Sequence, residues 1–92
     1  MANLGYLLMT ELHSEATAAD ENYERKSAFE DAENMVNNFL HGRSGIECLT
    51  LTKKVIVDWI SEGDRSDEEK LAFGDALIIL DILAEQYDIA IV

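Results

Sequence analysis

The stretch AFEDAENMVNNFLHG, residues 28–42, decides the fold class because its apolar residues recur with the period of an α-helix. The apolar positions are Ala28, Phe29, Ala32, Met35, Val36, Phe39 and Leu40. They follow the i, i+3, i+4, i+7 pattern of an amphipathic helix, and the acidic and amide residues fall on the opposite side. His41 and Gly42 form a C-terminal stop. We therefore predict a helix over about 21–41.

Further helices are predicted on both sides of this stretch, and no proline interrupts any of them. The first covers roughly 3–18, where leucines recur on one side. Thr52 is placed to cap a helix that runs through about Glu62, and the last helix starts near Asp67. The fold class that follows is mainly α, a compact bundle of about four helices.

Two segments leave a purely helical chain open to question. Residues 46–51 alternate partly between apolar and polar, and residues 89–92 are rich in β-branched side chains. The alternative is therefore the same bundle with a short two-stranded β element that pairs 46–51 with 89–92. In either case, residues 1–92 are long enough for a single core, which predicts one acidic helical domain.

The last helix is apolar around most of its circumference, and its polar face is narrow. A helix of this kind is central to its fold or is buried against a second subunit. We predict that its large apolar residues serve the core or a homodimer interface. These residues are Leu77, Leu80, Leu83 and Tyr87.

The strongest compositional signal is a net charge of -12, from 19 acidic and 7 basic residues. The charge is uneven, because residues 11–33 carry a net -6, residues 34–61 a net +1 and residues 62–92 a net -7. A chain this anionic is repelled by nucleic acid and by anionic membranes, and it is attracted to basic surfaces. We expect no direct nucleic-acid binding and no membrane binding, and we expect a basic protein as the partner.

The most acidic short run, SEGDRSDEEK over residues 61–70, does not have the pattern of a calcium loop. Oxygen ligands do not alternate along it, and no glycine stands at the sixth position. Its local explanation is a helix start, since Ser66 and Glu69 have the spacing of a capping box. The remaining acids of the run extend a larger acidic surface.

No arrangement of residues predicts catalysis or a cofactor. His13, His41 and Cys48 are scattered, without the i, i+3 or i, i+4 spacing that a zinc site uses. The loop 42–45 is neither a nucleophile elbow nor a phosphate-binding loop. We expect a protein that is not an enzyme, with no metal and no cofactor.

The location of the protein is predicted from two features of the chain. The N-terminal run of apolar residues ends at Glu11, which is too short for a membrane span, and it lacks a basic leader. A lone cysteine, Cys48, excludes an internal disulfide and fits a reducing compartment. We expect a cytoplasmic protein.

Regularly spaced carboxylates are the remaining functional signal. Helix residues i and i+4 are about 6 Å apart along the axis, which is similar to the separation of phosphates along a DNA strand. The pairs Glu11/Glu15 and Asp20/Glu24 and the row Asp81/Glu85/Asp88 have this spacing. The full set of candidate phosphate-mimicking residues is Glu11, Glu15, Asp20, Glu21, Glu24, Glu30, Asp31, Glu33, Glu62, Asp64, Asp67, Glu68, Asp81, Glu85 and Asp88.

In length, charge, helical character and its two acidic segments (11–33 and 62–88), the whole chain resembles the DNA-mimic anti-restriction proteins of bacteriophages. The resemblance implies an early phage protein that acts in the host cytoplasm as an inhibitor. Its implied target is a basic host DNA-binding protein, either a restriction nuclease or a nucleoid-associated protein. It also implies a homodimer whose two subunits extend the charged surface. The competing hypothesis is an acidic helical protein–protein adaptor without DNA mimicry.

Overall fold

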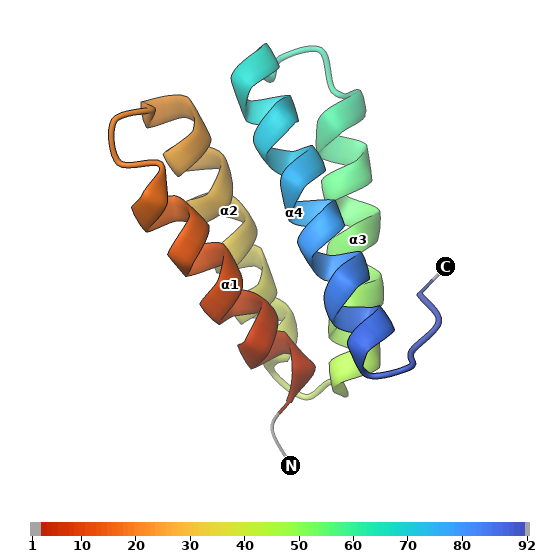
Figure 1. The fold of residues 1–92 in the computed structure, drawn as a ribbon. Helices are drawn as coiled ribbons and strands as arrows, with labels where there is room; N and C mark the ends of the chain where they lie inside the picture. The colour runs from red at the N-terminus through yellow and green to blue at the C-terminus, as the bar shows by residue number, and fades with distance from the viewer. Residues whose placement is uncertain (1–2, 92) are drawn as a thin grey trace.

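The computed structural model describes residues 3–91 and contains four α-helices in this range. They are α1 (Leu4–Ala18), α2 (Tyr23–Leu40), α3 (Gly45–Ser61) and α4 (Asp67–Gln86). Short connections join successive antiparallel helices, so the chain runs up and down twice (Figure 1). The prediction of a four-helix, mainly α bundle is confirmed.

Each helix begins at a polar side chain that accepts a hydrogen bond from a backbone N–H in the first turn. Asn3 caps α1, Asn22 caps α2, Ser44 caps α3 and Ser66 caps α4. At Ser66 the predicted capping box is complete, because the Glu69 side chain also accepts from the Ser66 backbone N–H. These caps satisfy donors that a helix start otherwise leaves unpaired.

The alternative with a short β element is wrong. Residues 46–51 lie inside α3, and the part of the chain between 3 and 91 contains no strand. Ser44 caps this helix, so Thr52 is not its cap but a buried residue within it. Residues 89–91 follow α4 without strand pairing, and Val92 lies outside the described residues.

The helical period explains why α3 overrides the strand propensity of its first half. Cys48, Leu49, Thr52 and Ile56 are all buried, and their spacing places them on one face of a helix. Starting the helix only at Thr52 would remove Cys48 and Leu49 from the core. Burial of this face therefore outweighs the weak preference of β-branched residues for extended backbone.

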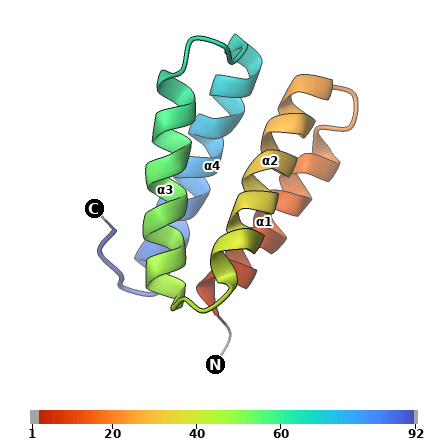
Figure 2. The same ribbon diagram turned by 180° about the vertical axis from the view of Figure 1, so that it is seen from behind.

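The core lies between all four helices. Its largest fully buried side chains include Phe29 from α2 and Phe73 from α4, and the half-buried Trp59 of α3 contacts Phe73 with ring centroids 5.2 Å apart. Seen from behind, α2 and α3 lie in front of α1 and α4 (Figure 2). The core thus holds α1 and α2 against α3 and α4.

Candidate acidic interaction surface

The connection between α1 and α2 and the connection between α3 and α4 lie at the same end of the bundle (Figure 1). Three polar contacts join them or the helix turns beside them. Asn22 Nδ2 donates to Glu68 Oε2 over 3.3 Å, Arg25 pairs with Asp75 at 2.8 Å, and Arg65 pairs with Asp31. We call this end, with residues 19–22, 62–66 and the adjoining helix turns, the acidic end. It brings together the two acidic segments that are far apart in the sequence.

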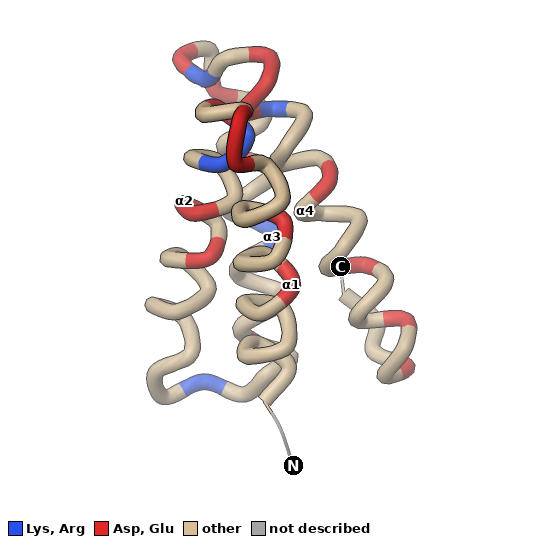
Figure 3. Tube along the Cα trace, turned by 60° about the vertical axis from the view of Figure 1, so that its left-hand side comes forward, with Lys and Arg blue, Asp and Glu red and all other residues tan. Residues whose placement is uncertain are grey.

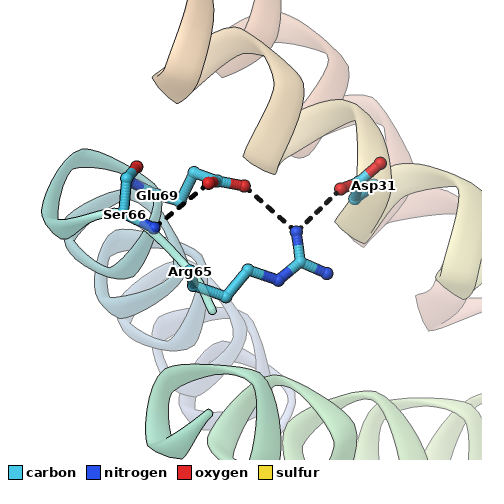
Figure 4. Close-up of polar contacts among 4 residues, drawn as sticks. All are labelled: Asp31, Arg65, Ser66 and Glu69. Carbon is cyan, nitrogen blue, oxygen red and sulfur yellow. Dashed lines mark hydrogen bonds and ion pairs between the residues drawn. The ribbon is translucent and has the colours of Figure 1, made fainter. Parts of the chain in front are cut away.

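Arg65 is the central residue of the acidic end (Figure 4). One guanidinium nitrogen, Nη1, lies 3.2 Å from Asp31 Oδ2 on α2 and 3.1 Å from Glu69 Oε2 on α4. The guanidinium also lies over the rings of Trp59 and Phe73, at 5.0 and 5.1 Å from their centroids. Arg65 therefore ties the α3–α4 connection to α2 and to the aromatic core.

The environment shifts the pKa of Arg65 and of Glu69 in opposite directions. Burial acts to lower the pKa of Arg65, but its hydrogen bonds to Glu69 and Asp31 outweigh burial and raise it. The pKa of Glu69 is lowered, first by the Ser66 backbone N–H and then by Arg65. The pair is fully charged at neutral pH, and it neutralises part of the acidic end from within.

Most of the candidate carboxylates are exposed. The exposed ones are Glu11, Asp20, Glu21, Glu24, Glu30, Glu62, Asp64, Asp67, Glu68, Asp81, Glu85 and Asp88. The half-buried ones are Glu15, Asp31 and Glu33. Acidic positions gather in the half of the bundle that holds the acidic end, with a further group along the end of α4 (Figure 3).

Few of these carboxylates have a cationic partner within the described residues. Arg65 pairs with Asp31, Lys26 with Asp20 at 3.7 Å, Lys53 with Asp81 at 3.3 Å, and the His13 ring lies 3.2 Å from Glu33. The candidates without an ion pair in residues 3–91 are Glu11, Glu15, Glu21, Glu24, Glu30, Glu62, Asp64, Asp67, Glu68, Glu85 and Asp88. The acidic surface is therefore largely uncompensated.

The acids of the acidic end have different local roles. Glu24 in α2 and Asp67 and Glu68 in α4 lie in first turns, where the helix dipole favours negative charge. Glu62 and Asp64 follow the C-terminus of α3, where the dipole disfavours it, and α3 has no basic residue in its last turn. The helix dipole thus explains the first group and leaves Glu62 unexplained, while Asp64 also lies two residues before Ser66, the N-cap of α4.

The structure revises the predicted rows of regularly spaced carboxylates. Glu11 and Glu15 share α1, as expected. Asp20 lies in the connection after α1 and Glu24 lies in α2, so these two do not share a helix, because the chain turns between them. In the third row, Asp81 and Glu85 share α4, but Asp88 lies beyond its C-terminus.

Asp88 lies beyond α4 with a backbone φ of 55°, in the left-handed region. The Asp88 N–H donates to Glu85 O at 3.1 Å, and the Ile89 N–H donates to Ala84 O at 2.9 Å. These two bonds form a Schellman motif, in which glycine is the usual residue at the left-handed position. The C-terminal end of α4 lies at the end of the bundle opposite the acidic end, so its acids form a separate group (Figure 1).

The apolar residues predicted for a core or dimer role are divided between the core and the exposed surface. Leu80 and Leu83 are buried in the core, Leu77 is half-buried against it, and Tyr87 is exposed. Sequence reasoning did not single out the residues of α4 that are both large and exposed. These are Leu71, Ile78 and Ile82, which we call the α4 stripe. The sequence signal that could have identified them is their position on the same side of a helical wheel.

The remaining chemical groups define no second site. Within residues 3–91, no three His, Cys, Asp or Glu side chains lie close enough to hold a metal ion. Cys48 is buried, and burial raises the pKa of its thiol. None of the described helices has the length and apolar character needed to cross a membrane.

Fold and surface together define a class: a small four-helix bundle with an acidic end whose charge is only partly compensated. Comparison with known proteins adds no relative, since no family model, curated protein or solved structure matches the chain.

Proposed function

We propose that this protein is a DNA-mimic inhibitor, in which carboxylates of the acidic end occupy the phosphate sites of a basic DNA-binding protein. The observation that carries the proposal is the meeting of two acidic segments at one end, where most carboxylates have no cationic partner. Such a surface offers a target's Arg and Lys side chains the charge that a duplex backbone offers. The mechanism needs no cofactor and no catalytic step.

The particular form that we propose is a phage-encoded inhibitor of a host restriction nuclease, with a nucleoid-associated protein as the other target class. Both kinds of target present a basic groove to DNA. Binding between such a groove and this surface is electrostatic, so the affinity is expected to fall steeply as salt rises. A homodimer remains a prediction, and sedimentation equilibrium across a range of concentrations tests it.

Displacement of DNA is the direct test. Labelled duplex DNA is bound to a basic DNA-binding protein at low salt, and added wild-type protein is expected to release it. In the variant Glu21→Gln/Glu62→Gln/Asp64→Asn, we expect much weaker release, because three exposed carboxylates of the acidic end are lost.

A matched control separates the acidic end from net charge. Asp81→Asn/Glu85→Gln/Asp88→Asn removes the same charge from the end of α4 and is expected to retain most of the release. No release of DNA by the wild type contradicts the proposal. If the α4 variant loses more of the DNA release than the acidic-end variant, the acidic end is not the binding surface.

The second candidate is an acidic helical adaptor that docks α4 on a partner, and the exposed α4 stripe favours it. Competition with DNA discriminates the two functions. An adaptor binds its partner whether or not DNA is present, whereas a DNA mimic and DNA exclude each other.

A further inference from the structure

The α4 stripe is an exposed apolar surface that the fold leaves uncovered. Leu71, Ile78 and Ile82 are 61%, 57% and 52% exposed, although they lie on one side of a helix whose other face forms the core. Beside the stripe is a hollow of about 210 Å³ between α1 and α4, lined in part by Ile82 and Glu11. Gly74 and the ion-paired Asp75 lie between Leu71 and Ile78 along this face. Exposed apolar side chains aligned on one helix face are a candidate interaction site.

Carboxylates flank the stripe on both sides. At about 100° per residue, Glu68 falls within about 60° of the stripe on one side, and Asp67 and Glu85 fall within the same angle on the other. All three are exposed and have no ion pair in the described chain. Across the hollow, Glu11 adds negative charge from α1. The surface is an apolar strip between two acidic borders.

We infer that the α4 stripe binds a basic amphipathic helix, with apolar residues of that helix on the stripe and its Lys and Arg side chains on the acidic borders. In helix-in-groove recognition the bound helix carries apolar anchors at i, i+3, i+4 and i+7. Leu71, Ile78 and Ile82 are spaced by seven and four residues along α4, so they extend over a length that such a row of anchors can follow. Positive flanks on the bound helix would pair with Glu68, Glu85 and Glu11 instead of repelling them.

A second copy of this chain fits the same face poorly. Two copies that join stripe to stripe bring acidic borders opposite acidic borders in either relative direction, and each copy carries a net charge of -12. A stable dimer also buries roughly 800 Å² on each partner, which requires far more apolar contact than three side chains supply. The charge and the size of the stripe therefore favour a basic helix.

The apolar stripe is separate from the carboxylates Glu21, Glu62 and Asp64 that the DNA-release test varies, although its borders share Asp67 and Glu68 with the acidic end. The inference rests on the proposed function only in expecting a basic partner. The test uses a synthetic helix of about five turns made of Leu and Lys, with Leu on one face. A second peptide of the same composition alternates Leu and Lys, so it has the same charge without an apolar helical stripe. Binding to the full chain is measured by fluorescence anisotropy at about 0.15 M salt.

We expect the wild type to bind the amphipathic peptide at least about tenfold more tightly than the alternating peptide. Ile78→Ser/Ile82→Ser is expected to abolish this preference, and Leu71→Ser gives an independent variant at the other end of the stripe. Ile46→Ser is the matched control, since Ile46 is 51% exposed but lies on α3, and it should keep the preference.

Equal binding of the two peptides overturns the inference, as does retention of the preference in both stripe variants. A wild type that sediments as a dimer and becomes monomeric in Ile78→Ser/Ile82→Ser also overturns it, because a second copy then covers the stripe. These outcomes leave the proposed function standing, since the acidic-end variants test that function through DNA release.

Discussion

Replacing Arg65 by methionine is expected to separate the α3–α4 connection from α2 while leaving the aromatic core packed. Methionine keeps an aliphatic side chain over Trp59 and Phe73 but removes the hydrogen bonds to Asp31 and Glu69. Glu69 retains its bond from the Ser66 backbone N–H, so the capping box survives. The variant therefore isolates the charged contacts of Arg65.

The expected loss follows from the geometry of these contacts. Hydrogen bonds to charged groups contribute about 1.5–3 kcal/mol each when buried. The Asp31 side chain is 42% exposed, and solvent screening reduces its share, whereas the Glu69 side chain is only 20% exposed. We expect a loss of about 2 kcal/mol in the free energy of unfolding, which corresponds to about 8–16 °C in Tm.

Urea unfolding followed by the fluorescence of Trp59 measures this loss. Lys70→Met is the control, because it removes the same charge from a residue without an ion pair in the described structure, and it should cost less than about 0.5 kcal/mol. A double-mutant cycle with Asp31→Asn is expected to show coupling between the two residues. Equal losses in Arg65→Met and Lys70→Met, or no coupling, refute the reasoning.

Acid adds an independent check on the same contacts. The pKa of Glu69 is lowered in the folded state, so its contribution is present above its unfolded pKa of about 4.3 and is lost as the pH falls through the folded value. Arg65 stays charged throughout. The difference in stability between wild type and Arg65→Met should therefore narrow below about pH 4.

Three further predictions concern stability. Asp88→Gly should raise the free energy of unfolding by about 1 kcal/mol, because it relieves a left-handed backbone and removes an acid from a helix C-terminus; a lower urea midpoint contradicts this. Gly5→Ala should cost about 1–3 kcal/mol, because the new Cβ meets the Leu40 side chain, whereas Gly74→Ala, which meets nothing within 4 Å, should gain up to about 1 kcal/mol; urea midpoints of the same sign contradict this pair. Raising NaCl should raise the thermal midpoint of the wild type, because the net charge of -12 repels itself; a falling midpoint would mean that the ion pairs dominate.

The helices were predictable from the sequence where apolar spacing and capping residues agreed. The predicted range 21–41 matches α2, because one clean stripe is followed by Gly42, whose φ is 74°. The start of α3 was missed because the β-branched and alternating character of 46–51 outweighed the signal of Ser44 as a cap. Burial of Cys48 beside Leu49 decides this segment, and that burial depends on contacts with other helices.

The acidic site was predictable as a composition but not as an arrangement. The sequence identifies carboxylates and their spacing within one helix, as at Glu11 and Glu15. That residues near Asp20 and Asp64 lie at one end depends on the antiparallel course of the helices and on Arg65, which bridges distant segments. Which acids have an ion-pair partner also depends on the tertiary structure, since Lys53 of α3 pairs with Asp81 of α4.

Charge at the helix ends separates a functional explanation of the acids from an explanation by stability alone. None of the four helices has a basic residue in its last turn, although a cation there would stabilise the helix. At the C-terminus of α3, Glu62 and Asp64 are exposed acids instead. Glu62, the C-cap of α3, therefore carries a charge that the dipole of this helix disfavours, whereas Asp64 also lies two residues before the N-cap of α4, where negative charge is favoured.

The variant Glu62→Gln/Asp64→Asn consequently has two expected effects of opposite sign. Its free energy of unfolding should rise by about a few tenths of a kcal/mol, because the charge of Glu62 leaves the C-terminus of α3. Its release of DNA from a basic protein should weaken, because two phosphate-like groups are lost. Weaker release together with higher stability would be the trade-off between stability and activity that is expected of charges kept for binding. If release is unchanged while stability rises, these carboxylates serve solubility, and the binding surface must be sought elsewhere on the acidic end.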